Sequence, residues 1–168
     1  RLARVFDENI GHDEKLCTKA LANPNFPIER LSEIAYSNAN SKIGKSCINN
    51  PNCPEDAIKH IICNGDYFRV RALERLDEDF LKEFSQKHEN NSIASMAINY
   101  ISDGEFLADI FDKNKGRNRN NAVRNPNFPI EKLVDIAKHH SNDHIRIISF
   151  NNPNLPEDVL KNIAHSDP

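Results

Sequence analysis

The stretch NPNFPIERLSEIA at residues 23–35 returns almost unchanged as NPNFPIEKLVDIA at residues 125–137. Two more copies of the opening motif, NPNCP at 50–54 and NPNLP at 152–156, each begin 27 residues after the preceding copy. Self-similarity at a fixed period of this length indicates a repeat protein in which each unit packs against its neighbours. The motif therefore predicts the fold class before any other feature of the chain.

The residues after each motif predict an α-helix. Apolar side chains recur there every three or four residues, which places them on one helical face. Proline at the first helical position loses no useful hydrogen bond, and the acids after it complement the helix dipole. In the four clear copies the apolar residues are Ile28, Leu31, Ile34 and Ala35, then Ala57, Ile58, Ile61 and Ile62, then Ile130, Leu133, Ile136 and Ala137, and finally Val159, Leu160, Ile163 and Ala164.

Two degenerate copies fill the middle of the chain, where the motif is lost but the apolar pattern continues. The front of the chain adds a unit entered part-way, because Leu2, Val5 and Phe6 match the apolar pattern. Steps between equivalent positions are then 27, 26, 26, 23 and 27 residues. The positions taken as equivalent are Leu31, Ile58, Phe84, Ile110, Leu133 and Leu160.

Each unit is expected to hold a second, shorter helix before the next motif. Asp66 and Asp143 are the predicted N-caps of two such helices, with a basic residue, Arg69 or Arg146, three positions later. The motif itself has an architectural interpretation, since proline forces the preceding residue out of the helical region and asparagine bonds the exposed turn backbone. Close helix packing is expected at the small or apolar positions Ala20, Cys47, Leu73, Ala122 and Ser149.

These features resemble the leucine-rich repeat variant family, which is similar in build to HEAT repeats. The resemblance rests on the Asn-Pro-Asn-x-Pro turn, the helix of Leu31 or Leu133 type, and the Asp-x-x-Arg segments. It implies a right-handed superhelix in which an α-helix alternates with a shorter helix, often 3₁₀, and such repeats generally serve as binding scaffolds. We therefore expect an all-α solenoid of about six repeats of 23–27 residues, a single domain over residues 1–168 that belongs to a longer array.

Composition excludes several classes of protein. The formal charge of −3 gives no global attraction to nucleic acid, and 38% hydrophobic residues suit a folded chain. No apolar stretch approaches the ~20 residues of a membrane helix, and the start does not resemble a signal peptide. The expected compartment is the cytoplasm, with no membrane partner.

Cysteine and histidine raise the question of a metal site. Cys17, Cys47, Cys53 and Cys63 contain no Cys-x-x-Cys pair, and Cys47 and Cys53 fall at expected core positions. Three histidines lie close together in the sequence: His139, His140 and His144. His140 and His144 have helical spacing, but a turn at Ser141-Asn142 separates them. The sequence therefore predicts no metal and no cofactor. It also shows no nucleophile–base arrangement, so we predict no catalytic residue.

Basic residues give the one candidate binding surface. Lys15, Lys42, Arg117 and His144 lie the same number of residues before their motifs, and stacking would align them in a stripe. Either these residues form a solvated helix face, or they bind an anionic partner. The candidates for that partner's site are Lys42, Arg69, Arg117, Arg119 and Arg124.

The leading functional hypothesis is a non-catalytic scaffold for protein–protein interaction. The alternative is a solenoid that binds nucleic acid through the basic stripe. Aromatic side chains on which bases could stack are not interleaved with the cations, which counts against single-strand binding. Flanking acids on the first helices also favour a protein partner.

Overall fold

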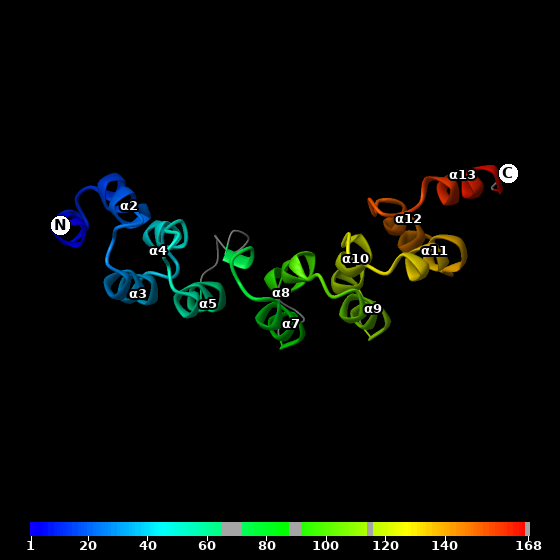
Figure 1. The fold of residues 1–168 in the computed structure, drawn as a ribbon, viewed down its shortest axis with the longest axis horizontal. Coiled ribbons are helices and arrows are strands. Elements are labelled where there is room, and N and C mark those ends of the chain that lie inside the picture. Colours follow the sequence, from blue (N-terminus) through cyan, green and yellow to red (C-terminus); the bar gives the residue numbers. More distant parts are fainter. Residues whose placement is uncertain (65–71, 88–91, 114–115, 167–168) are drawn as a thin grey trace. The chain divides into compact units, whose positions relative to one another are not determined.

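The computed structural model describes residues 1–64, 72–87, 92–113 and 116–166. Twelve α-helices and one 3₁₀ helix have their bounds within those segments, which contain no β-strand. The all-helical prediction is confirmed. The chain divides into two compact units, Arg1–Leu76 and Asp77–Pro168, and each is described by itself (Figure 1). The prediction of one repeat domain over residues 1–168 stays a prediction.

The helix that follows each motif, or that takes the same place in the two middle repeats without the motif, is here called a first helix. It is ten residues long in every complete repeat described. An eight-residue helix, α1 (Leu2–Asn9), begins the chain in the same role. The ten-residue helices are α3 (Ile28–Ser37), α5 (Glu55–Asn64), α7 (Glu78–Lys87), α9 (Gly104–Lys113), α11 (Ile130–His139) and α13 (Glu157–Ser166).

The helix that precedes each motif, here called a second helix, is shorter, as the sequence predicts. A 3₁₀ helix, η1 (Ile98–Tyr100), continues one of them, and the other described second helices are α-helical throughout. The second helices are α2 (Glu14–Ala22), α4 (Lys42–Ile48), α8 (Ser92–Ala97), α10 (Arg117–Arg124) and α12 (Asp143–Phe150).

In α3, α5, α7, α9 and α11 the buried stripe lies at positions four, seven and eight, whereas in α13 Val159 is buried, Leu160 is half-buried and Ala164 is exposed. Leu133 at position four of α11 has no exposed surface, which confirms its predicted place in the core. The equivalences proposed for the two middle repeats are wrong by one turn. Leu81 and Leu107, not Phe84 and Ile110, occupy position four of α7 and α9. Because positions four and seven are both apolar, two alignments of the repeats that differ by one helical turn fit the sequence equally well.

Two helix starts also differ from expectation. Pro27 stands immediately before α3 as its N-cap, and its carbonyl accepts the first helical hydrogen bond from Leu31 at 2.9 Å. The N-cap of α12 is Asn142 rather than Asp143, because the Asn142 side chain accepts from the backbone N–H of Ile145. The other predicted N-cap, Asp66, lies outside the described residues.

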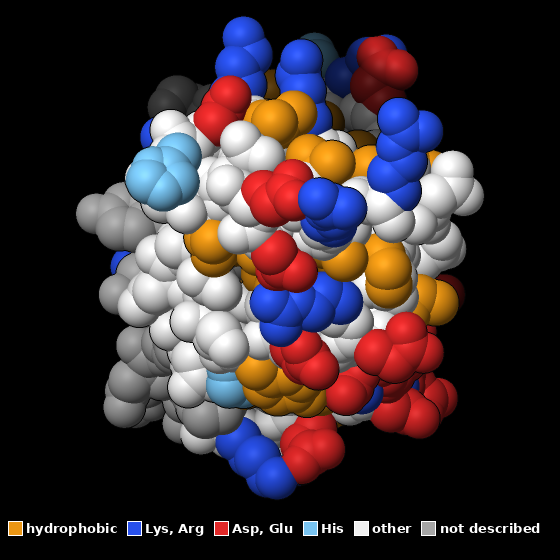
Figure 2. Space-filling view, turned by 90° about the vertical axis from the view of Figure 1, so that its left-hand side faces the viewer, with side chains coloured by type: hydrophobic (Ala, Val, Ile, Leu, Met, Phe, Trp, Pro, Cys, Tyr) orange, Lys and Arg blue, Asp and Glu red, His pale blue; other side chains and the backbone are white. Residues whose placement is uncertain are grey.

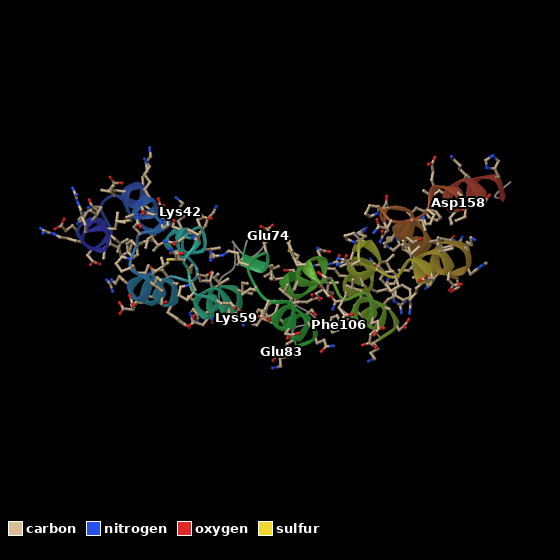
Figure 3. The ribbon with its side chains drawn as sticks, viewed as in Figure 1. Lys42, Lys59, Glu74, Glu83, Phe106 and Asp158 are labelled. Carbon is tan, nitrogen blue, oxygen red and sulfur yellow. The ribbon has the colours of Figure 1, made fainter. Side chains whose placement is uncertain are left out.

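First and second helices form separate layers within unit 1. In Figure 1, α2 packs beside α4 in one layer, and α3 packs beside α5 in the other. Lys42 and Lys59 mark the two layers in Figure 3. A glycine permits the close contact between α4 and the turn before it, since a Cβ at Gly44 would lie 2.4 Å from the Asn38 carbonyl oxygen. In unit 2, α10 likewise packs against α12.

The asparagines of the motif join neighbouring repeats. In unit 1 the Asn50 amide donates to the carbonyls of Leu21 and Asn23, at 2.6 and 2.8 Å. In unit 2 the Asn152 amide does the same to Val123 and Asn125, at 2.6 and 2.9 Å. These side chains also bond the turn backbone, as predicted, because Oδ1 of Asn50 and of Asn152 accepts from the backbone N–H two residues later, each at 2.9 Å. The first asparagine of the motif is buried in three of four copies and links one repeat to the one before it.

Arg75 replaces the asparagine amides at the next junction of unit 1. Its guanidinium donates to the carbonyls of Ile48 and Asn50, which stand 27 residues after those that Asn50 binds. It also donates to Pro51 and Cys53, each at 3.1 Å. One planar group with five N–H donors therefore serves a junction that lacks the motif.

An acidic side chain joins α7 to the repeat of α9. The Glu78 carboxylate accepts from the backbone N–H groups of Ser102 and Asp103, at 2.9 and 2.7 Å. Lys82 then pairs with Asp103 at 2.8 Å. Side chain to backbone bonding is thus common to these junctions, although the residue type changes.

Candidate functional site

Charge is divided between the two kinds of helix. In unit 1, α3 and α5 carry four acids and two cations, whereas α2 and α4 carry one acid and four lysines. In unit 2, α10 carries three arginines and no acid. The exposed face of the second helices is therefore the cationic face of each unit.

Three of the five predicted site residues lie on that face. Lys42 and Arg117 each stand eight residues before their motif and are exposed, at the start of α4 and α10. Arg124 is exposed in the last turn of α10. Lys42 belongs to unit 1 and the two arginines to unit 2, while Arg69 lies outside the described residues. The structure thus brings Arg117 and Arg124 onto one helix.

Arg119 does not belong to this exposed set. The expectation that it is exposed is wrong, because the side chain is half-buried against α9. Its Nε donates to the carbonyl of Phe111 at 2.9 Å, and the guanidinium lies 5.0 Å from the centre of the Phe111 ring. Arg146, at the same place in its repeat, donates to His140 O at 3.1 Å. Arginine at this position bonds the end of the preceding first helix.

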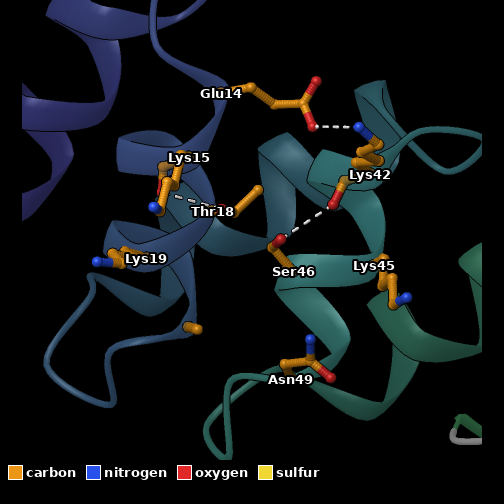
Figure 4. Close-up of a pocket in the computed structure, with 9 residues that line it drawn as sticks. Glu14, Lys15, Thr18, Lys19, Lys42, Lys45, Ser46 and Asn49 are labelled. Carbon is orange, nitrogen blue, oxygen red and sulfur yellow. Dashed lines mark hydrogen bonds and ion pairs between the residues drawn. The ribbon is translucent and has the colours of Figure 1, made fainter.

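A groove of about 800 Å³ lies between α2 and α4 (Figure 4). Its floor holds small side chains, including Ser46, which is buried. Lysines from both helices form its rim, and Asn49 stands at one end. The lining residues are Glu14, Lys15, Thr18, Lys19, Ala22, Lys42, Lys45, Ser46 and Asn49.

Local contacts determine which groups in the groove can meet a ligand. The hydroxyls of Thr18 and Ser46 donate to helix carbonyls, at 3.0 and 2.9 Å. Glu14 and Lys42 form an ion pair of 3.0 Å across the groove. Lys15 and Lys19 have no ion-pair partner among the residues that the structure describes. The free ammonium groups therefore come from α2.

Lys19, Lys45 and Glu14 also line the groove, although the sequence pattern did not identify them as site residues. Lys19 follows Lys15 by four residues, and Lys45 follows Lys42 by three, so each pair shares a helical face. That spacing was visible in the sequence. The packing of α2 against α4, which makes one groove of the two faces, required the structure.

The end of unit 1 at α1 has a different character. Figure 2 shows cationic and acidic side chains interleaved there, with hydrophobic side chains between them. Arg4 pairs with Glu8, and Arg30 pairs with Asp7 and Glu33, all within 2.8 Å. Neutralised pairs of this kind leave little field for a charged partner, so the groove is the better candidate.

The cysteines divide into buried and exposed thiols. Cys17, Cys47 and Cys53 are buried, which confirms the predicted core positions of Cys47 and Cys53. Cys63 is exposed at the end of α5, so it does not share the packing role of the other three cysteines. Burial raises the pKa of Cys47 to about 12 and that of Cys53 to about 11.

The histidines do not gather. His139 ends α11 and His144 stands in α12, so the predicted break between them is confirmed. His140 accepts from Asn142 N at 3.1 Å and packs against Phe111. No group of three His, Cys, Asp or Glu side chains suited to a metal ion occurs in the described part of the chain.

No family model, curated protein or solved structure matches this chain. Of the helices that the structure describes, none has the length and apolar character needed to cross a membrane.

Proposed function

We propose that this chain is a non-catalytic scaffold that binds an acidic segment of a partner protein on its second-helix face. The carrying observation is the groove between α2 and α4, where four lysines meet one glutamate. Multiple ammonium groups on one concave surface attract carboxylates and raise their local concentration. The acids of α3 and α5 lie in the other layer, so they leave this attraction in place.

The proposed architecture is a right-handed α-solenoid of the leucine-rich repeat variant type. Support comes from the junctions, where equivalent side chains bond equivalent carbonyls 27 residues apart. The proposal includes a cytoplasmic location. Four cysteines without a disulfide are usual in that reducing compartment.

A binding role is favoured over catalysis by the groups in the groove. Both lining hydroxyls donate to helix carbonyls, and the single carboxylate is paired with Lys42. Of the described residues that line the groove, none is a histidine or cysteine that could activate a nucleophile. The lining groups therefore supply charge and hydrogen bonds only.

A protein partner is favoured over nucleic acid because none of the described residues that line the groove is aromatic. Nucleic-acid surfaces for single strands combine cations with aromatic rings on which bases stack. Duplex binding requires cations that follow two phosphate strands, whereas the lysines of this groove come from α2 and α4 alone. The second candidate function, nucleic-acid binding, thus becomes an alternative outcome of the same test.

The test measures fluorescence anisotropy with a labelled peptide of alternating glutamate and serine. A peptide with glutamine in place of glutamate is the neutral control, and single-stranded and duplex DNA of equal charge are competitors. We expect binding of the acidic peptide that weakens with added salt, and DNA binding no tighter than the ~10⁻⁴–10⁻⁶ M of non-specific contact. Equal binding of both peptides, or sub-micromolar DNA binding, would overturn the proposal.

A further inference from the structure

Glu14 is the one acidic side chain of the groove, and it bridges two repeats. Its Oε1 lies 3.0 Å from Nζ of Lys42, so the pair joins the start of α2 to the start of α4 (Figure 4). The side chains of Glu14 and Lys42 are 55% and 71% exposed. Ion pairs this exposed are weak and exchange readily with other charges.

The repeat architecture does not require an acid at this position. The N-cap of α2 is Asp13, which accepts from Leu16 N at 2.9 Å, so capping does not depend on Glu14. A negative charge in the first turn does stabilise a helix, and Glu14 shares that general effect. At the same distance before the motif, the other repeats carry Ser41, Gly116 and Asp143.

We propose that Glu14 competes with the acidic segment for Lys42. When the segment binds, one of its carboxylates replaces the Glu14 carboxylate on Lys42. This inference rests on the proposed function and concerns the regulation of the same site. An incoming carboxylate makes the contact that Glu14 gives up, so Lys42 stays paired throughout. Repulsion between Glu14 and the acidic segment lowers the affinity of the free groove.

The spacing of the lysines matches an extended segment. Lys15 and Lys19 are one helical turn apart, about 6 Å along α2. Alternate side chains of an extended peptide lie about 6.6 Å apart on one side of the chain. Acids at alternate positions therefore meet Lys15 and Lys19 in turn, and a carboxylate beside them meets Lys42 across the groove.

The experiment compares Glu14→Gln with Glu29→Gln in the anisotropy assay with the alternating glutamate and serine peptide. Both variants remove one negative charge from unit 1, but Glu29 lies on α3 in the other layer. We expect Glu14→Gln to bind about three- to tenfold tighter than the wild type, and Glu29→Gln to stay within about twofold. Lys15→Ala with Lys19→Ala should weaken binding by more than about tenfold, since neither ammonium group has an ion-pair partner in the described segments of the chain.

The possible outcomes distinguish failure of the Glu14 role from failure of the proposed function. If the wild type binds and the double lysine variant does not, but Glu14→Gln gains no more than Glu29→Gln, the competitor role is wrong and the scaffold stands. If no variant prefers the acidic peptide to the neutral one, the proposed function and the inference both fail. A melting curve of Glu14→Gln shows whether the helix is intact, and Glu14→Asp, which keeps the charge, should not gain affinity.

Discussion

The guanidinium of Arg75 donates to the main-chain oxygen of Asn50 at 2.8 Å, where asparagine amides bind in other repeat junctions. Asn50 in turn donates to Asn23 O at the same distance. The two residues therefore form consecutive steps of one chain of hydrogen bonds, although one carries a cation and the other a neutral amide. The position requires convergent N–H donors more than it requires asparagine.

Replacing Arg75 should destabilise unit 1. Arg75→Ala leaves four carbonyl oxygens without this donor, and we expect a loss of about 2–4 kcal/mol. Arg75→Lys should be intermediate, since an ammonium lacks the planar fork. Urea unfolding followed by circular dichroism measures the effect. The control is Lys19→Ala, an exposed cation whose loss should cost less than about 0.5 kcal/mol. Equal stability of the two alanine variants would contradict the role of Arg75.

Two asparagines at the same motif position should differ in their effect on stability. Asn50 is fully buried and bonds both the preceding motif and Asn52 N, whereas the side-chain nitrogen of Asn23 has no partner among the described residues. We expect Asn50→Ala to cost about 2–4 kcal/mol and Asn23→Ala about 1 kcal/mol, from urea midpoints. If both variants lost the same free energy of unfolding, the asparagine would be necessary for the turn within the motif and not for the link between repeats.

The apolar spacing was sufficient to predict the helices and much of the core. Leu31 and Leu133 are both fully buried, as expected from periods of three and four residues. The shift at Phe84 and Ile110 shows the limit of that signal. Without the motif, the start of each of these helices is marked by a capping aspartate, Asp77 or Asp103, and not by proline. Apolar residues one turn apart then fit the pattern equally well.

The junctions and the site depended on contacts that a single repeat does not reveal. Arg75 resembles neither asparagine nor proline, so its equivalence follows only from the carbonyls that it binds. Arg119 and Arg117 are two residues apart in the same basic stretch, yet one is half-buried and the other exposed. The two side chains project from α10 in different directions relative to α9, and net charge does not indicate which of them is buried.

Thiol reactivity should divide the cysteines into one reactive and three protected groups. The thiolate is the nucleophile, and burial raises the pKa of Cys47 to about 12 and of Cys53 to about 11. Burial also raises the pKa of Cys17. At about pH 8, Ellman's reagent should titrate Cys63 rapidly and the other three only after denaturation. A Cys63→Ser variant should lose the rapid phase. Two or more fast thiols in the folded wild type would show that the buried positions open readily.

The ion pair of Lys82 with Asp103 should make stability depend on pH at both ends of the range. The hydrogen bond from Lys82 is the main cause that lowers the pKa of Asp103 below 3.8, and the bond to Asp103 likewise raises the pKa of Lys82 above 10.5. The carboxylate therefore stabilises the fold above its unfolded pKa, and this contribution is lost as pH falls through the lower folded value. The ammonium contributes below 10.5 and loses its contribution as pH rises through the higher folded value.

Asp103→Asn tests this dependence and keeps the helix cap. Asp103 Oδ1 accepts from Phe106 N at 3.0 Å, and an asparagine oxygen can do the same. The variant therefore keeps the cap and removes the charge together with the Oδ2 acceptor of Lys82. We expect the wild type to be more stable than the variant near neutral pH, with the difference shrinking as pH falls below the unfolded value of about 3.9 toward the lower folded pKa, where the wild-type carboxylate takes up a proton. Urea midpoints across the range measure it, and Lys82→Gln should show the same loss of pH dependence. A difference that stays constant from neutral to acid would mean that the cost comes from packing at this junction and not from the charge on Asp103.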